Sequence, residues 1–461
     1  MRVLLINPNV ALESPWSGKE AVPPIGLMYL GAVLERDNYE VGIIDANWRK
    51  LSQIDLSREL VKHRPDIVGI TTDSCNFNDS LKVARVAKNV THAIVIMGGP
   101  HATVLPNEVI RYPEVDIVVF GEGEQTLLDV LQRIEEGNSL QGCEGTLFKQ
   151  DNEVIHNPPR ARITNLDELP FPARHLVAFE EYPHKYSFSR IRAPVSTVST
   201  SRGCPFDCSF CSNKVIWGKY VARSPKNVVD EIEYLVNRYG AKGIYFREDN
   251  FTVDNKRLLQ ICEELLRRRV EVEWECSSRV DLVKRDLLRE MYKAGCRGIW
   301  YGVESGSEKT LKILNKRITK DQSREAIAIT KEAGIKVGGS FMIGVPGETM
   351  DDINDTLRFV QELNCDHVGI GIFVGIPISR LYDEIVEKRM IDAAYGHILF
   401  VKTDQFDRRT LEEITRDFHR VTELGTCQRL LPWQQVISKL PRSLVIWGSW
   451  VRNVGSRGWR L

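Results

Sequence analysis

Three cysteines lie close together in one stretch of the sequence that is rich in loop-forming residues. Cys204, Cys208 and Cys211 follow a C-x-x-x-C-x-x-C spacing, among glycine, proline and aspartate residues. Thiolates this close can bind one soft-metal cluster, and they are the usual ligands of iron–sulfur clusters. Three ligands for a four-iron cubane leave one iron open to a substrate or cofactor. The alternative is a structural zinc site, but such a site uses four protein ligands and no partner C-x-x-C pair lies nearby.

Residues 191–385 alternate short apolar, β-branched runs with helical patterns. This alternation predicts six βα units, an open relative of the eight-unit barrel, in which catalytic groups come from the carboxyl ends of the strands. The predicted strands are Val195–Thr200, Gly243–Phe246, Glu273–Cys276, Gly298–Val303, Val337–Ile343 and His367–Val374. The predicted helices include Lys256–Arg269, Asp286–Ala294, Lys320–Ala333 and Thr349–Leu363.

Charged side chains follow the second and third of these strands. Glu248 and Asp249 could accept hydrogen bonds from an ammonium group, and the alternative is a solvated acidic turn. Ser277 and Arg279 follow the third strand, where a guanidinium suits a carboxylate ligand. The alternative for Arg279 is an ion pair with a neighbouring aspartate such as Asp281.

The fourth and fifth strands end in a glutamate and in glycines. Glu304 lies in Gly-Val-Glu-Ser-Gly at the end of a buried strand, where a carboxylate must have a partner. Ile343 and Gly344 begin a Gly-Val-Pro-Gly-Glu stretch, and a glycine there allows a flat ligand to come close. A plain strand-to-helix turn is the alternative for Gly344.

The cysteine loop resembles the signature of the radical S-adenosylmethionine (SAM) enzymes. The resemblance implies that Cys204, Cys208 and Cys211 hold a [4Fe–4S] cluster whose open iron is chelated by SAM. One electron from the cluster then cleaves a C–S bond to give a 5′-deoxyadenosyl radical. The same resemblance implies SAM contacts at Phe210, beside the adenine, and at Glu248, Asp249, Ser277, Arg279, Glu304, Ile343 and Gly344.

Residues 1–150 predict a doubly wound parallel sheet. Short apolar strands alternate with helices, and ligands of such sheets bind beyond the carboxyl ends of the strands. The predicted strands are Val3–Ile6, Val41–Ile44, Ile67–Ile70, Ala93–Met97 and Val115–Phe120, and the predicted helices include Leu27–Leu34, Asp79–Val90 and Thr126–Gly137.

Three motifs of this region resemble the cobalamin-binding domain of one radical SAM subfamily. They are Pro-Pro-Ile-Gly at 23–26, Gly-Gly-Pro-His at 98–101 and Gly-Glu-Gly-Glu at 121–124. The loop after the first strand departs from many such domains because it contains no histidine, so cobalt would have no histidine ligand. The alternative is a domain that kept its fold and lost its cofactor. The resemblance implies cobalamin contacts at Thr71, Thr72, Ser74, Gly98, Gly99, His101, Gly121, Glu122 and Glu124.

The predicted fold class is α/β, with four regions along the chain. A Rossmann-like cobalamin-binding domain covers residues 1–150, and a proline-rich linker covers 151–190. A partial (β/α)6 barrel that carries the radical SAM motifs covers 191–385, and a small, mostly helical region covers 386–461. A helix is predicted at Leu411–Val421. The tail beyond it interleaves arginine with tryptophan, which favours peripheral contact with a membrane, and a helix packed on the barrel is the alternative.

The composition excludes several classes of protein. Among 461 residues, 62 Lys and Arg balance 62 Asp and Glu, which argues against a surface that binds nucleic acid. The ten cysteines do not form a secreted disulfide pattern. The start of the chain resembles a buried strand rather than a signal peptide, and no apolar run is long enough to span a membrane. We therefore expect a cytoplasmic enzyme, with membrane association through its tail.

The resemblance implies a radical SAM enzyme that acts on an unactivated carbon of a small-molecule or lipid-like substrate. In the leading hypothesis methylcobalamin donates a methyl group to that carbon, and a donor such as flavodoxin or ferredoxin supplies electrons. The first alternative is a dehydratase, cyclase or oxidative enzyme that does not use cobalamin. The second is a binding module stabilised by zinc. The residues do not identify the group that reacts with the substrate.

Overall fold

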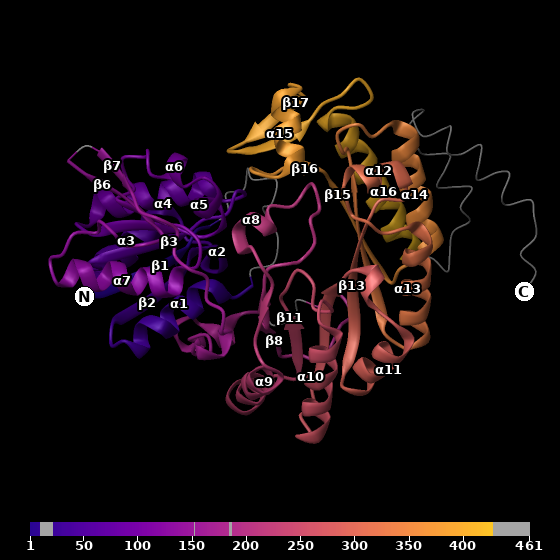
Figure 1. Cartoon of the computed structure of the whole chain (residues 1–461), viewed down its shortest axis with the longest axis horizontal. Helices are drawn as coiled ribbons and strands as arrows, with labels where there is room; N and C mark the ends of the chain where they lie inside the picture. Colours follow the sequence, from indigo (N-terminus) through magenta and orange to yellow (C-terminus); the bar gives the residue numbers. More distant parts are fainter. Residues whose placement is uncertain (10–21, 152, 184–186, 427–461) are drawn as a thin grey trace, which may run out of the picture. The chain divides into compact units, whose positions relative to one another are not determined.

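The computed structural model describes residues 1–9, 22–151, 153–183 and 187–426. They form two compact units, Met1–Phe406 and Asp407–Leu461, of which the second is described only as far as residue 426. The first unit contains two large sheets, each with its own helices (Figure 1).

The first sheet has seven strands in the described part of the chain, in the order β2-β1-β3-β4-β5-β6-β7. Strands β1 to β5 are parallel, while β6 pairs antiparallel with both β5 and β7. Their bounds are β1 Arg2–Asn7, β2 Glu40–Asp45, β3 Ile67–Thr71, β4 Ile94–Gly98, β5 Ile117–Val119, β6 Thr146–Gln150 and β7 Glu153–His156. The helices are α1 Ile25–Arg36, α2 Ala46–Arg49, α3 Gln53–His63, α4 Phe77–Val90, α5 Pro100–Val104, α6 Pro106–Val109 and α7 Gly123–Glu135.

Both faces of this sheet are buried, which explains why its strands are continuous apolar runs. Leu4 and Ile6 of β1 pack into the core under α3 and α4, whereas Val3 and Leu5 pack into the core under α1 and α7. Alternate residues of a strand point to opposite faces, so a strand covered on both sides needs apolar residues throughout. The predicted strands and helices of residues 1–137 are present.

The β6–β7 hairpin was not predicted. Thr146–Gln150 and Glu153–His156 pair antiparallel at the edge of the sheet, within a stretch interpreted as the end of the first domain and an extended linker. Each strand is only four or five residues long, and such short runs carry little periodicity. The parallel sheet therefore continues into an antiparallel edge.

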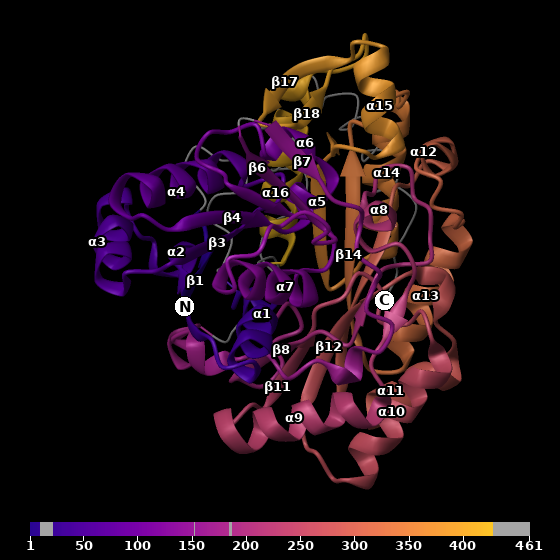
Figure 2. The ribbon, with the colours of Figure 1, turned by 60° about the vertical axis from the view of Figure 1, so that its left-hand side comes forward.

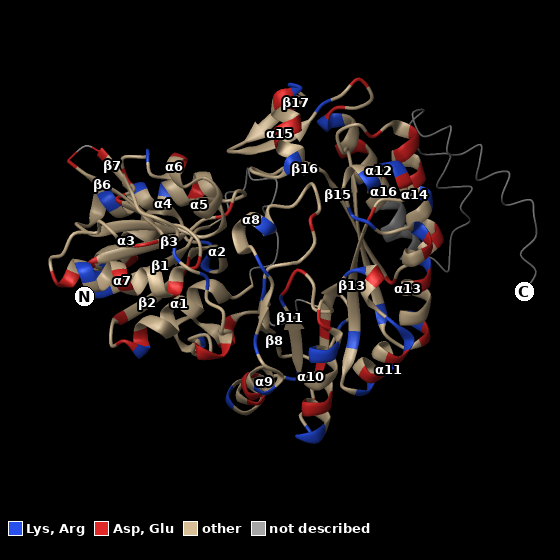
Figure 3. Cartoon of the chain, in the orientation of Figure 1, with Lys and Arg blue, Asp and Glu red and all other residues tan. Residues whose placement is uncertain are grey.

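The second sheet has six parallel strands among the described residues, in the order β15-β14-β13-β12-β11-β8. The bounds are β8 Val195–Val198, β11 Gly243–Phe246, β12 Glu273–Ser278, β13 Cys296–Glu304, β14 Lys336–Ile343 and β15 His367–Ile372. The larger helices are α9 Pro225–Tyr239, α10 Asn255–Arg267, α11 Arg285–Lys293, α13 Lys320–Glu332 and α14 Met350–Leu363. They follow one face of the sheet (Figures 1 and 2) and carry charged residues of both signs (Figure 3). The prediction of six βα units in an open barrel is confirmed.

Local capping explains where α9 begins and ends. The Ser224 hydroxyl accepts the backbone N–H of Asn227 at 3.2 Å, and Pro225 occupies the first helical position. Gly240 ends the helix with φ +63°, a conformation that glycine adopts without steric cost.

A small antiparallel sheet follows the barrel and was also not predicted. It consists of β16 Val374–Gly375, β17 Ile391–Tyr395 and β18 Ile398–Val401, with α15 Arg380–Glu387 between the first two strands. Residues 391–401 therefore form a hairpin within the region expected to be mostly helical.

The second unit contains α16, Arg408–Thr426, in its described part. The helix predicted at Leu411–Val421 is therefore present. The tryptophan-rich tail, on which membrane contact was predicted, lies outside the described residues. Among the described helices, none combines the length and apolarity needed to cross a membrane.

A buried cluster of ions connects the barrel to the segment before it. Glu231 of α9 accepts a hydrogen bond from Arg174 at 2.6 Å and one from Arg223, and its side chain is fully buried. Arg174 lies in a short 3-10 turn, Arg174–Leu176, and also donates to the Thr197 carbonyl at 2.9 Å. Burial alone would raise the pKa of Glu231, but Arg223 and Arg174 outweigh it and hold that pKa below its usual value.

Replacing Glu231 with glutamine should destabilise the protein strongly, because both guanidinium groups would lose their buried counter-charge. We expect the free energy of unfolding to fall by about 3–5 kcal/mol. Glu233→Gln is the matched control, since Glu233 lies on the same helix and pairs with Arg268 near the surface, at 2.8 Å. The control should cost less than about 1 kcal/mol. Urea unfolding of both variants measures the difference, and equal losses would contradict the prediction.

Candidate active site

The three cysteines follow β9, Ser201–Arg202, at the end of the barrel sheet where β8 finishes. Cys204 and Cys208 are partly exposed and Cys211 is exposed. Although the residue as a whole is exposed, protein atoms around its sulfur desolvate the Cys211 thiol and raise its pKa to about 11, with Asp249 and the other two cysteines acting in the same direction and the Asn213 N–H opposing it. Burial likewise raises the pKa of Cys204. The Cys211 thiol is thus close enough to the other two cysteines to interact with them, and a metal binds such residues as thiolates.

The cysteine loop fits a cubane better than a single metal ion. Among the described residues, no group of three His, Cys, Asp or Glu side chains is arranged to hold one metal ion. A cubane does not need such convergence, because each thiolate binds a different iron. Asn213 supports this loop, since its backbone N–H donates to Cys211 Sγ at 3.4 Å.

Two segments far along the chain hold the cysteine loop in place. The N–H of Ser209 donates to the Leu314 carbonyl at 3.0 Å, and the N–H of Leu381 donates to the Ser209 carbonyl at 3.1 Å. Asn315 and Arg380 each donate from their side chains to the Asp207 carbonyl, at 2.5 and 2.6 Å. The residues after β16 therefore contact the cluster loop itself.

The two acidic residues after β11, Glu248 and Asp249, have different partners. The Glu248 carboxylate accepts the Thr200 N–H at 2.6 Å and the Ser201 hydroxyl, so it supports the strand that leads into the cysteine loop. Burial raises the pKa of Glu248, and Arg257 opposes that rise. Asp249 is exposed and accepts from the side-chain amide of Asn213, which places it beside the loop. Asp249 is therefore the carboxylate of the pair that a ligand can reach.

Arg279 is buried, with its guanidinium engaged by protein groups. Its Nε and Nη2 donate to Asp281 at 2.9 and 3.0 Å, and Nη2 also donates to the Lys316 carbonyl at 2.7 Å. The bidentate contact of Arg279 with a SAM carboxylate stays a prediction, and in the structure the Nε–Nη2 edge of the guanidinium binds Asp281. The alternative, an ion pair with Asp281, is the one observed. Ser277, the neighbouring predicted contact, is half-buried and accepts the Phe251 N–H on its carbonyl at 2.9 Å.

Glu304 forms a buried ion pair at the end of β13. Its carboxylate accepts from Lys316 Nζ at 2.7 Å, and both side chains are about nine-tenths buried. Glu304 has φ +69°, a left-handed conformation that costs a non-glycine residue roughly 1–3 kcal/mol and that clusters at functional sites. A Cβ on Gly302 would lie 2.8 Å from Lys316 Nζ, so glycine at this position makes room for the pair.

Gly344 turns the chain at the end of β14. It has φ +87°, and its N–H donates to the Glu348 carboxylate at 2.7 Å. The Val345 N–H donates to the same oxygen at 3.1 Å. Burial raises the pKa of Glu348 to about 7, despite these two N–H donors. Ile343, the residue before the turn, is fully buried.

Three further polar residues at this end of the sheet were missed by sequence analysis. Lys316 pairs with Glu304, Asn213 bonds to Asp249, and Asn250 is buried. The Asn250 side-chain nitrogen is enclosed and has no hydrogen-bond partner among the described residues, which suits a polar ligand. A lysine or an asparagine in a polar loop has no local pattern that distinguishes it. Phe210, on the cysteine loop, is half-buried.

The predicted cobalamin contacts lie at the carboxyl ends of β3, β4 and β5. Thr71 ends β3 and Thr72 and Ser74 follow it, while Gly98 ends β4 and Gly99 follows it. Gly121 is exposed, and a Cβ built there would meet no atom within 4 Å among the described residues. Hydroxyls and uncrowded glycine backbone at one sheet edge fit a large ligand that carries amide groups.

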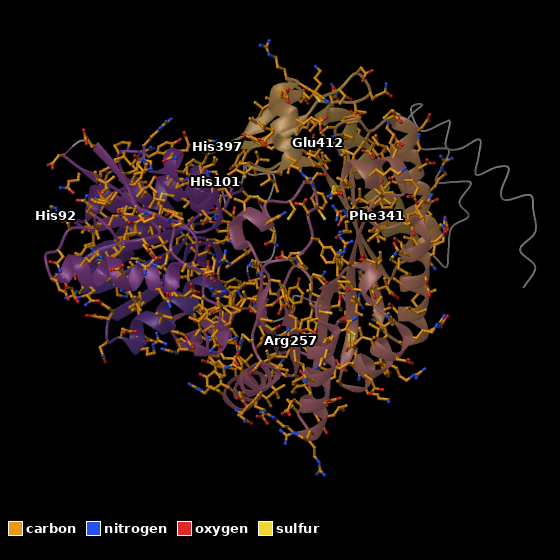
Figure 4. The ribbon with its side chains drawn as sticks, in the orientation of Figure 1. His92, His101, Arg257, Phe341, His397 and Glu412 are labelled. Carbon is orange, nitrogen blue, oxygen red and sulfur yellow. The ribbon has the colours of Figure 1, made fainter. Side chains whose placement is uncertain are left out.

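His101 lies in the interior rather than at the open edge. Its Nδ1 and the Ser74 hydroxyl share a hydrogen bond of 2.9 Å, and its ring lies 5.0 Å from that of His397 in the β17–β18 turn (Figure 4). Burial, and secondarily His397, lowers the pKa of His101 to about 3, so the ring is neutral. Among the described residues its Nε2 has no hydrogen-bond partner. The structure thus connects a predicted cobalamin contact with the small sheet after the barrel.

Glu122 and Glu124, two of the predicted cobalamin contacts, lie in a cluster of arginines. Both accept hydrogen bonds from Arg202, at 2.7 and 2.5 Å, and Glu122 also accepts from Arg162 at 3.0 Å. Their carboxylates are therefore occupied in a buried ion cluster with the residue that precedes the cysteine loop. They connect the first sheet to that loop, and their contact with cobalamin stays a prediction.

Comparisons with known proteins agree with this geometry. A family model described as the radical SAM superfamily matches residues 198–360, and one described as a B12 binding domain matches residues 17–131. The chain is 34% identical over 394 residues to an uncharacterized methyltransferase of Pyrococcus horikoshii, covering 85% of this chain and 84% of that protein. It is 30% identical over 438 residues to the anaerobic magnesium-protoporphyrin IX monomethyl ester cyclase of Rubrivivax gelatinosus, covering 91% and 77%.

The fold is similar to that of a solved radical SAM methyltransferase, TsrM from Kitasatospora setae, with a TM-score of 0.69 at 20% sequence identity. That alignment covers 86% of this chain and 76% of TsrM. The chain belongs to the radical SAM superfamily. Within it, the chain belongs to the cobalamin-dependent group, in which a B12-binding domain precedes the radical SAM barrel. The protein is therefore an enzyme whose cofactors are a [4Fe–4S] cluster, SAM and cobalamin.

The raised pKa of Glu348 predicts a specific dependence of stability on pH. In the unfolded chain this carboxyl has its ordinary pKa of 4.5, against about 7 in the fold. Between these values the unfolded state loses the proton first, so the free energy of unfolding falls as pH rises, by about 3 kcal/mol in total. Glu348→Gln stays neutral and should remove this fall. Glu325→Gln, on the exposed face of α13, should keep it.

Thermal unfolding of the SAM-free protein between pH 4.5 and 8 measures the effect. The wild-type and Glu325→Gln proteins should lose stability toward high pH more steeply than Glu348→Gln. Parallel profiles for all three proteins would contradict a raised pKa.

Proposed function

We propose that Cys204, Cys208 and Cys211 bind the [4Fe–4S] cluster and that the enzyme methylates an unactivated carbon of its substrate. The observation that carries this proposal is the cysteine loop, which lies where strands end in Asp249, Arg279 and Glu304. When bound, the cluster and SAM supply a 5′-deoxyadenosyl radical, and cobalamin supplies the methyl group. The chain binds and orients these groups and excludes water.

We assign roles at the SAM site from the atoms of each side chain that protein contacts leave available to a ligand. Asp249 is exposed beside the loop and would accept from the SAM ammonium. Glu304 has one oxygen on Lys316 and would bind a ribose hydroxyl or the ammonium with the other. The Ile343–Gly344 turn, with Phe210 on the loop, would flank the adenine, and Asn250 would donate its unpaired N–H to SAM.

The overall reaction we propose balances without a proton. A substrate C–H bond breaks and a C–CH3 bond forms, with two SAM molecules and two electrons consumed. The products are methylated substrate, 5′-deoxyadenosine, methionine and S-adenosylhomocysteine. A donor such as flavodoxin or ferredoxin would supply the electrons, and the substrate would be a small or lipid-like molecule. The residues after β16, which contact the cluster loop, would also contact the substrate.

The domain boundaries at residues 150, 190 and 385 also remain proposals. The last strand of the first sheet ends at His156, and the first strand of the barrel begins at Val195, so a linker between them has room for about the predicted length. Peripheral membrane contact by the tail after residue 426 is a proposal that rests on its sequence alone.

A cyclase is the second candidate function. The similarity to the Rubrivivax gelatinosus cyclase extends over 91% of this chain, more than the similarity to the Pyrococcus horikoshii methyltransferase. A cyclase would use the same radical without transferring a methyl group. The two hypotheses differ in whether SAM gives up its methyl group.

Replacing any one of Cys204, Cys208 and Cys211 with alanine should remove a cluster ligand. We expect the iron content after anaerobic reconstitution to fall at least fivefold, along with the absorbance of the thiolate-to-iron bands. Cys365→Ala is the control, because Cys365 lies just before β15 and outside the loop. Iron and sulfide assays measure the result. Retention of full iron by the Cys208→Ala protein would contradict the ligand assignment.

Anaerobic incubation of the reconstituted enzyme with SAM, cobalamin and a reductant should separate the two candidate functions. A methyltransferase should form both 5′-deoxyadenosine and S-adenosylhomocysteine, and should bind cobalamin in a spectroscopic titration. Release of 5′-deoxyadenosine without S-adenosylhomocysteine would favour the cyclase. Mass spectrometry of the products, with methyl-labelled SAM, measures the partition.

A further inference from the structure

The Arg279 guanidinium makes three hydrogen bonds to protein oxygens, and its remaining nitrogen points toward a cysteine sulfur. The Asp281 carboxylate accepts hydrogen bonds from Nε and Nη2, and the Lys316 carbonyl accepts a further one from Nη2, at 2.7–3.0 Å. The side chain is only 6% exposed. These three hydrogen bonds hold the edge of the guanidinium formed by Nε and Nη2, so they fix the orientation of its plane.

The remaining nitrogen, Nη1, lies 4.0 Å from Cys208 Sγ. The face of the guanidinium stacks on Phe206, with 3.8 Å between its central carbon and the ring centroid. Phe206 and Cys208 both belong to the cysteine loop. Arg279 therefore contacts that loop in two ways, with one N–H directed at the Cys208 sulfur and with its planar face stacked on Phe206. Its position just after the end of β12 sets this orientation.

A guanidinium in this position carries a permanent positive charge, since arginine does not lose its proton in proteins. Charges interact strongly where burial lowers the effective dielectric constant. Reduction adds one negative charge to a cluster, and hydrogen bonds and net charge around its sulfurs set its reduction potential.

We propose that Arg279 is a positioning residue that raises the reduction potential of the cluster through Cys208, and that it does not bind the SAM carboxylate. Asp281 and Lys316 act through Arg279 by holding its plane. The inference rests on the proposed function in one respect, namely that the cluster is bound by this loop.

The test is the midpoint potential of the reconstituted cluster without SAM, measured by an EPR-monitored redox titration. Arg279→Gln keeps a polar side chain but removes the charge. We expect its ratio of reduced to oxidised cluster at a fixed potential to fall about tenfold, equal to a shift of about 59 mV toward negative potential for a one-electron couple. Arg317→Gln is the matched control, because Arg317 is exposed and lies on the same loop as Lys316. The control should leave the ratio unchanged.

Arg279→Lys is the second variant, in case the glutamine variant does not take up iron. Lysine keeps the charge but cannot hold Asp281 and face Cys208 at once, so we expect the ratio to fall by about threefold. The inference would be overturned if an Arg279 variant that contains the cluster had the midpoint potential of the parent and bound SAM more weakly. That result would indicate that Arg279 binds SAM. A parent protein that takes up no iron would instead refute the proposed function, and this inference with it.

Discussion

The site depends on holding an irregular loop in one conformation. The cysteine loop contains little regular structure, so its own backbone supplies few hydrogen bonds to fix it. The missing bonds come from residues more than a hundred positions later, at Leu314, Asn315 and Leu381. Because Leu314 and Asn315 belong to the barrel and Leu381 lies in α15, after β16, the conformation of the loop depends on contacts with both regions.

Buried charges extend this constraint to the first sheet. Arg202, directly before the loop, pairs with Glu122 and Glu124. Glu231 pairs with Arg223, just before α9, and with Arg174, on the segment that joins the sheets. Buried ion pairs contribute little net stability, because desolvation offsets their attraction, but an unpaired partner is costly. Displacing the two sheets would separate these pairs and cost free energy. The pairs therefore keep the edge of the B12-binding sheet next to the cysteine loop.

Prediction of the fold from sequence succeeded where a strand is buried on both faces and failed where strands are short. The runs around Val3–Ile6 and Ile67–Ile70 are apolar throughout, and only a sheet covered by helices buries such a run fully. The β6–β7 and β17–β18 hairpins have four or five residues per strand, and their pairing depends on the edge that they join. Local patterns do not contain that information.

The sequence by itself determined the chemistry that is available: a trio of closely spaced thiols, a series of parallel strands and polar groups at their ends. Residue spacing encodes these features, because ligand number and strand periodicity are local properties. Only the tertiary structure decided which polar groups meet. Glu304 pairs with Lys316, Arg279 contacts Asp281 and Cys208, and the two glutamates of Gly-Glu-Gly-Glu pair with Arg202. A charged side chain pairs with the opposite charge that lies nearest in space, and packing of distant strands sets that distance.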